Sequence, residues 1–111
     1  MGLKSPYERD SYKPNPEIPF IVIAGDVVLT ALSNISSEFY HPDHGQNEKH
    51  IVIIQPSEPT NAIEKFLHDP NHRGKIKYLR GNIMNKIDLD RAGLADAQLA
   101  MILVNKYSKD S

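Results

Sequence analysis

The sequence contains no cysteine among its 111 residues. A disulfide framework, a thiolate metal site and a catalytic thiol are therefore excluded. It also has no excess of either charge, because 13 Lys and Arg residues stand against 14 Asp and Glu residues, for a formal net charge of −1. Proteins that bind nucleic acid through a basic face need clustered cations to neutralise phosphates. The balance of charge argues against a nucleic-acid partner.

Long hydrophobic runs are missing as well. No apolar stretch approaches the roughly 20 residues that a membrane-spanning helix needs, so we expect no direct membrane insertion of this sequence. The first 16 residues are polar and contain three prolines, which is not the pattern of a secretory signal. Proline removes a backbone donor and restricts the residue before it. We therefore predict an extended linker or tether over residues 1–18.

What the sequence does have is a regular alternation of short apolar runs and helical stripes. Uninterrupted apolar runs are typical of strands buried on both faces of a parallel sheet. They fall at residues 20–24, 51–54 and 99–104, and a fourth run, interrupted by Lys77, falls at 76–79. Helices are predicted between them. The side chains expected to face the sheet are Val28, Leu32, Ile35 and Phe39 in the first helix, Ile63, Phe66 and Leu67 in the second, and Ile87, Leu89 and Leu94 in the third.

The second of these helices should begin at a proline. Pro59 is expected in its first turn, where the missing N–H of proline costs no hydrogen bond. The third strand alternates more than the others, which suggests a place nearer an edge of the sheet.

The order βαβαβαβ predicts one α/β domain over residues 19–111. Right-handed crossovers then give a Rossmann-like parallel sheet, in the strand order 3-2-1-4, flanked by helices. In that order the fourth strand is an edge, and a long apolar edge invites association with another chain. We therefore interpret the sequence as the N-terminal part of a larger domain and expect further strands to cover this edge.

The strand order also predicts where a ligand would bind. Ligands of open α/β sheets lie beyond the carboxyl ends of the strands, at the point where the strand order reverses. In the predicted sheet this crevice lies between two pairs of residues. They are Gly25 and Asp26 after the first strand, and Asn105 and Lys106 after the fourth.

This crevice lacks both halves of the dinucleotide fingerprint. A dinucleotide needs a glycine-rich turn after the first strand, so that backbone amides can approach the pyrophosphate. The second and third glycines of that turn are replaced by Val27 and Thr30. Asp26 would add a negative charge where a phosphate must sit. At the end of the second strand, Gln55 stands in place of the acid that binds the ribose. We therefore expect no bound cofactor there.

No other arrangement of reactive side chains points to catalysis. His41 and His44 share a polar loop, but Asp43 is the sole nearby third ligand, so a solvated loop is favoured over a metal site. His68 and His72 would face alike on a helix, but a proline between them breaks it. There is no nucleophile elbow and no phosphate-cradling loop. We predict that the protein is not an enzyme.

The most specific pattern lies in the last third of the sequence. Residues 78–83 read Tyr-Leu-Arg-Gly-Asn-Ile, Asp88-Leu89 follows, and the fourth predicted strand ends in Asn-Lys-Tyr at 105–107. A lone glycine follows the first strand, and the next helix contains Leu32-Ser33-Asn34. Together these closely resemble the regulator-of-potassium-conductance (RCK) domain of slowpoke-type calcium-activated potassium channels. The resemblance covers residues 19–111 and corresponds to the N-terminal half of that domain.

The resemblance implies a regulatory module. In that family, such domains form a cytoplasmic ring beneath a tetrameric pore, and calcium binding expands the ring and opens the gate through a linker. It implies that this segment lies at the cytoplasmic face of a homotetrameric membrane channel, joined to the remaining RCK lobe and the pore domain. The family's calcium site begins shortly after Asn-Lys-Tyr, where Asp110 falls. Because Ca²⁺ takes roughly six to eight oxygen ligands, we expect this sequence alone to bind calcium weakly or not at all.

The alternative is a nucleotide-binding regulatory subunit of a bacterial-type potassium transporter, which would share the expected fold. Such a subunit binds NAD or ATP and requires the glycine turn and the acid after the second strand. The nucleotide half of an oxidoreductase would require them too, so the absence of both features disfavours these two readings. A scaffold that assembles without a ligand is a further possibility.

Overall fold

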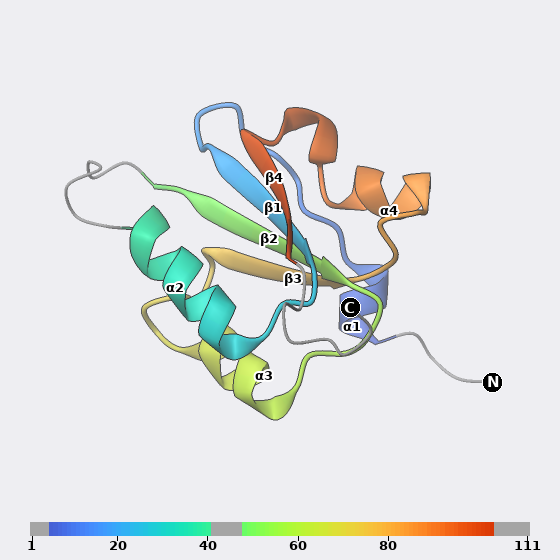
Figure 1. The fold of residues 1–111 in the computed structure, drawn as a ribbon. Coiled ribbons are helices and arrows are strands. Elements are labelled where there is room, and N and C mark those ends of the chain that lie inside the picture. The colour runs from blue at the N-terminus through green and yellow to red at the C-terminus, as the bar shows by residue number, and fades with distance from the viewer. Residues whose placement is uncertain (1–4, 41–47, 104–111) are drawn as a thin grey trace.

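The computed structural model describes residues 5–40 and 48–103, and its centre is a four-stranded sheet. Every neighbouring pair of strands is parallel. The strands are β1 (Phe20–Gly25), β2 (His50–Gln55), β3 (Ile76–Arg80) and β4 (Leu99–Leu103). They lie in the order β3-β2-β1-β4 (Figure 1). The predicted α/β class and the predicted strand order are confirmed.

Helices cover both faces of the sheet. Helices α2 (Leu29–Phe39) and α3 (Asn61–His68) share one face, and α4 (Lys86–Arg91) lies on the other (Figure 1). A 3₁₀ turn at Leu94–Asp96 leads from α4 to β4, and α1 (Pro6–Arg9) lies beside β3. In the described ranges, none of the helices is long and apolar enough to cross a bilayer.

The two-residue period of a strand sends alternate side chains of β1 into two separate cores. Ile21 and Ile23 point toward α2 and α3, whereas Phe20 and Val22 point toward α4. Both sets are almost completely buried, because β1 is paired on each side and covered on each face. This explains why the sequence of β1 is continuously apolar.

Three side chains differ from the sequence expectations. Val28 is not on the inner face of α2; it is the residue before the first turn and is 51% exposed. Pro59 precedes α3, because Thr60 caps the helix: its hydroxyl accepts a hydrogen bond from the N–H of Ile63 at 3.2 Å, and the helix starts at Asn61. Ile87 is 70% exposed, since the inner side of the short helix α4 is taken by other residues, among them the fully buried Ala92 that ends it.

The N-terminal segment is not extended throughout, contrary to expectation. Pro6–Arg9 is helical because the Ser5 hydroxyl accepts the N–H of Glu8, and the Glu8 carboxylate accepts the N–H of Ser5, each at 3.3 Å. The proline stands at the start of this helix, where it is tolerated. The division of the chain at residue 18 stays a prediction.

This segment passes from one face of the sheet to the other around β3. The ring of Tyr7 packs edge-on against Tyr78 on the α3 side, with 5.5 Å between ring centroids. The ring of Tyr12 packs against Phe20 on the α4 side, at 4.6 Å. The residues between the two tyrosines therefore cross the edge of the sheet.

Candidate functional site

Backbone contacts between β1 and β4 occupy the described side of the predicted crevice, at the end of β1. Gly25 has φ +95°, and a Cβ atom at this position would lie 2.3 Å from the carbonyl oxygen of Leu103. The N–H of Asp26 donates to that same oxygen at 3.0 Å. Glycine is required here because the end of β4 approaches the turn too closely for any side chain.

The side chain of Gln55 ties the ends of three strands together. Its amide nitrogen donates to the carbonyl oxygen of Gly25 at 2.6 Å. Its amide oxygen accepts the hydroxyl of Tyr78 at 3.3 Å. Gln55 thus links β2 to β1 and to β3 at the place where a nucleotide-binding sheet would present its ribose acid.

This geometry does not suit a dinucleotide. The Asp26 amide, which such a turn would offer to a pyrophosphate, is bonded within the sheet. Val27, at the second glycine position, is buried in the core beneath α2 and α3. The Gln55 amide is satisfied by protein groups on both of its atoms. The groups that a dinucleotide turn and a ribose acid would offer to a ligand are thus bonded to the protein at the described end of β1.

The other sequence-derived site residues are placed only in part. Gly25 and Asp26 lie together at the carboxyl end of β1, whereas Asn105, Lys106 and Asp110 lie outside the described residues. The histidine pair at 41 and 44 also lies outside them. Within residues 5–40 and 48–103, no three His, Asp or Glu side chains converge as a metal site would require.

One of the histidines considered for a metal is structural instead. The ring of His72 stacks on Phe66 with 4.0 Å between centroids, and its Nδ1 lies 3.0 Å from the Phe66 carbonyl oxygen. These contacts hold the loop between α3 and β3 against α3.

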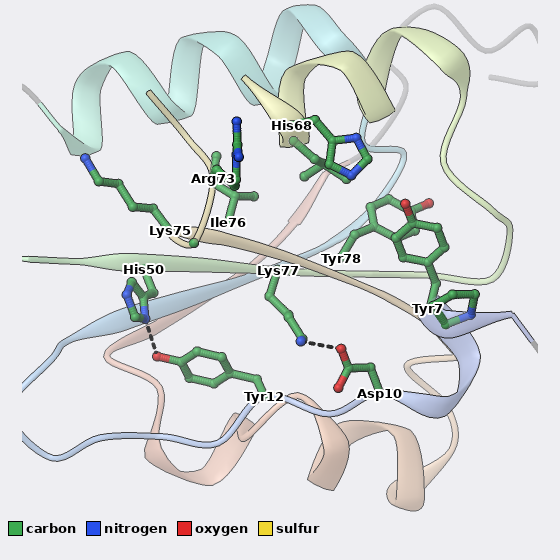
Figure 2. Close-up of a pocket in the computed structure, with 13 residues that line it drawn as sticks. Tyr7, Asp10, Tyr12, His50, His68, Arg73, Lys75, Ile76, Lys77 and Tyr78 are labelled. Carbon is green, nitrogen blue, oxygen red and sulfur yellow. Dashed lines mark hydrogen bonds and ion pairs between the residues drawn. The ribbon is translucent and has the colours of Figure 1, made fainter. Parts of the chain in front are cut away.

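A cleft that the sequence analysis missed runs along β3, with a volume of about 410 Å³. One wall is the N-terminal segment, and the other is β3 together with the loop before it (Figure 2). The polar and aromatic side chains lining it are Tyr7, Asp10, Tyr12, His50, His68, Arg73, Lys75, Lys77 and Tyr78. The signal in the sequence was the presence of two tyrosines in a segment that is otherwise polar and proline-bearing.

One pair of opposite charges bridges the cleft. The ammonium of Lys77 points away from the α3 face and donates to the carboxylate of Asp10 (Figure 2). This hydrogen bond lowers the pKa of the Asp10 carboxyl below its ordinary value of 3.8, despite partial burial that acts the other way. The cleft is therefore a seam between two parts of the chain more than an open cationic pocket.

Tyrosine hydroxyls complete the same seam on both faces of the sheet. The hydroxyl of Tyr7 donates to the Glu64 carboxylate of α3 at 3.1 Å, and burial followed by this bond raises the pKa of Tyr7. The hydroxyl of Tyr12 lies 2.8 Å from Nδ1 of His50, whose Nε2 lies 2.7 Å from the Glu48 carboxylate. Burial, followed by the charge of Glu48, raises the pKa of Tyr12.

A family model covers almost all of this fold. The calcium-activated potassium channel slowpoke-like RCK domain matches residues 17–111. The chain belongs to that family. The family resemblance drawn from Gly25, residues 78–83 and the Asn-Lys-Tyr element is thereby confirmed.

Two curated relatives agree with the family model. The chain is 27% identical over 97 residues to the calcium-activated potassium channel slo-1 of Caenorhabditis elegans, an alignment that covers 87% of the chain and 8% of the relative. It is 28% identical over 90 residues to the calcium-activated potassium channel slowpoke of Drosophila melanogaster, covering 81% and 7%. The chain thus spans less than a tenth of the length of either relative.

The match to the slowpoke-like RCK domain divides the two sites. Gly25, at the predicted crevice, lies inside the matched range. Tyr7, Asp10 and Tyr12, which form one wall of the cleft, precede residue 17. The cleft is therefore built jointly from the RCK fold and from a segment that the family model does not describe.

Proposed function

We propose that this chain serves as a cytoplasmic regulatory domain of a potassium channel, one that couples a signal inside the cell to opening of the pore. The observation that carries the proposal is the slowpoke-like RCK match over residues 17–111. Both curated relatives are named as calcium-activated potassium channels. A role in regulation, with no catalysis, also fits the end of β1, where Gln55 donates to the Gly25 carbonyl oxygen and the Asp26 N–H donates to that of Leu103.

The partners that we propose are the remaining lobe of an RCK domain and a channel pore, assembled as a homotetramer. The apolar strand β4 supports this arrangement, because Ile102 is 63% exposed at an edge of the described sheet. Further strands beside β4 would bury it and continue the parallel order.

The described residues bring no three acidic or histidine side chains together. Calcium sensing would therefore require ligands from outside them. Asp110 stays our proposed calcium ligand, on the strength of its place after the Asn-Lys-Tyr element. Because calcium takes several oxygen ligands, the remainder would have to come from other residues of the assembled channel.

The proposal is tested by transplanting residues 17–111 in place of the corresponding segment of the Drosophila slowpoke channel. Potassium currents are recorded from excised patches as calcium is raised through roughly 10⁻⁷ to 10⁻⁵ M, the range of intracellular sensors. We expect the hybrid channel to open with calcium. The same hybrid carrying Asp110→Ala should need a higher calcium concentration.

Surface labelling provides the control for assembly. A hybrid that reaches the membrane and conducts, but opens without regard to calcium, would contradict a regulatory role for this chain. A hybrid whose calcium response is untouched by Asp110→Ala would remove Asp110 from the proposed site while leaving the regulatory role in place.

A further inference from the structure

The guanidinium of Arg91, at the end of α4, holds three backbone carbonyl groups. Its Nη2 donates to the carbonyl oxygen of Tyr7 at 2.8 Å, and its Nε donates to that of Asp10 at 2.9 Å. Its Nη1 donates to the carbonyl oxygen of Arg80, the last residue of β3, at 2.9 Å. The same nitrogen also pairs with Asp88 one turn earlier in α4, at 2.8 Å. One side chain thus connects the N-terminal segment, the end of an edge strand and a helix.

The connection between α4 and the N-terminal segment runs in both directions. While the side chain of Arg91 donates to the segment, its own carbonyl oxygen accepts the N–H of Tyr12 at 2.8 Å. Arg91 is mostly withdrawn from solvent, with 17% of its side chain exposed, which strengthens these charge-assisted bonds. Two carbonyls and one amide of the segment are therefore fixed by a single residue of α4.

The other contacts of the segment, residues 5–16, are exposed or partly buried. They include hydrogen bonds from the Ser5 hydroxyl to Glu58 and from the Tyr7 hydroxyl to Glu64, and one between Tyr12 and His50. We call this segment the N-terminal strap. None of its residues is buried. Its ion pairs, Asp10 with Lys77 and Glu8 with Arg80, are partly exposed, and such pairs contribute little to stability. Its ring contacts through Tyr7 and Tyr12 are made from partly exposed positions. An element with few buried apolar contacts opens at a lower free energy than the core to which it is attached.

We propose that the N-terminal strap is a releasable element that opens as a unit without unfolding the sheet, and that Arg91 couples its docking to α4 and to the end of β3. Release removes the wall of the β3 cleft that Tyr7, Asp10 and Tyr12 provide. It also leaves the Arg91 guanidinium bonded to the Arg80 carbonyl and the Asp88 carboxylate alone, so that α4 loses its contact with the strap.

In the regulatory domain proposed above, docking or release of the strap would be transmitted to α4 through Arg91. The release itself does not depend on that function, because every contact involved lies within this chain. Evidence against strap release would therefore not contradict the regulatory role, and evidence against the regulatory role would not contradict strap release.

The test is backbone amide exchange, measured by NMR on the 111-residue chain. The informative amide is that of Tyr12, which donates to Arg91, and the reference is that of Ile53 in the central strand β2. We expect the Tyr12 amide to exchange through a local opening that is insensitive to low urea, and to exchange faster than the Ile53 amide. Arg91→Lys keeps the charge but loses the planar fork, and should speed Tyr12 exchange by roughly tenfold while leaving Ile53 unchanged.

Two further variants make the experiment specific. Arg9→Lys makes the same chemical change within the strap at a guanidinium with no bond to any described side chain or carbonyl, and should leave Tyr12 exchange unchanged. Asp10→Asn weakens the pairing with Lys77 while keeping the Asp10 backbone carbonyl that Arg91 binds, and should speed Tyr12 exchange by about twofold to fivefold.

The proposal is overturned if the Tyr12 and Ile53 amides exchange together with the same urea dependence, because the strap would then be part of the cooperative core. It is equally overturned if Arg91→Lys and Asp10→Asn both leave Tyr12 exchange at the wild-type rate. If Arg91→Lys speeds both amides alike, Arg91 is a general stabilising residue and not the coupling residue, even if Asp10→Asn still loosens the strap.

Discussion

The two edges of the sheet differ in what covers them and in their sequences. At the β3 edge, the N-terminal strap crosses from one face to the other and pairs with Lys77 and Arg80. At the β4 edge, Leu99 and Ile102 are exposed, and β4 contains no charged residue at all. Charged side chains on β3 are typical of an edge that avoids unwanted pairing, whereas the composition of β4 is that of a central strand.

At the β3 edge the exposed strand has the charged side chains expected of an edge. At the β4 edge the exposed strand has the apolar side chains expected of a central strand. The strap covers β3 with partly exposed ion pairs, each of which contributes little to stability. The exposed apolar side chains of β4 call for a strand or a chain that buries them. The first edge is suited to movement and the second to assembly.

The largest expected effect comes from forcing β1 and β4 apart at their carboxyl ends. Gly25→Ala places a methyl group 2.3 Å from the Leu103 carbonyl oxygen, at a φ of +95° that disfavours any side chain. The strands β1 and β4 would have to separate at their carboxyl ends. We expect the free energy of unfolding to fall by about 3 kcal/mol or more, measured by urea denaturation followed by circular dichroism.

Gly74→Ala is the matched control for this change. Gly74 also has a positive φ, +83°, but a Cβ there would meet no atom within 4 Å. It should cost only about 1 kcal/mol of conformational strain. Equal losses for the two variants would mean that Gly25 is needed for its backbone angle and not for the closeness of β4.

A smaller effect is expected on association through the exposed β4 edge. The wild-type chain should self-associate at high concentration, and Ile102→Lys should weaken this by roughly tenfold or more, because a lysine on an edge strand opposes pairing. Sedimentation measures the association directly. Ile87→Lys changes an equally exposed isoleucine on α4 and should leave association unchanged. A wild-type chain that stays monomeric at millimolar concentration would contradict the assembly role of this edge.

The smallest effect concerns the ion pair at the β3 edge. The folded-state pKa of Asp10 is lowered by Lys77, so the pair contributes stability above the unfolded-state pKa and loses it as pH falls through the folded-state value. Asp10→Asn should therefore lower the free energy of unfolding by a few tenths of a kcal/mol at pH 7, since the pair is partly exposed and screened by solvent. Thermal unfolding of the two proteins should converge well below pH 3.8. A gap that persists there would assign the effect to something other than charge.

Most of the fold could be predicted because its signals are local. Continuous apolar runs indicated β1, β2 and β4, an alternating run indicated β3, and the right-handed crossover rule gave the strand order. The errors at Val28 and Ile87 arose where a helix start and a short helix contain apolar residues that tertiary packing does not bury. Periodicity assigns such residues to the inner face, but only the partner surface decides which of them are covered.

The candidate sites divide in the same way. The lack of a dinucleotide fingerprint at the crevice is visible in the sequence, because Val27, Thr30 and Gln55 replace the residues that the turn and the ribose require. The role of Gln55 as a link between three strands could not be predicted, since it depends on the spacing of neighbouring strands.

The sequence by itself determined the α/β class, the parallel order of the strands, the family resemblance and the lack of a nucleotide fingerprint, because each is written in side chains close together along the chain. Only the tertiary structure decided that the N-terminal strap is docked and that Arg91 holds it. The bonds from Arg91 to Tyr7 and Asp10 join residues 84 and 81 positions apart. Their acceptors are backbone carbonyls, which every residue possesses, so no pattern of side chains marks them in advance.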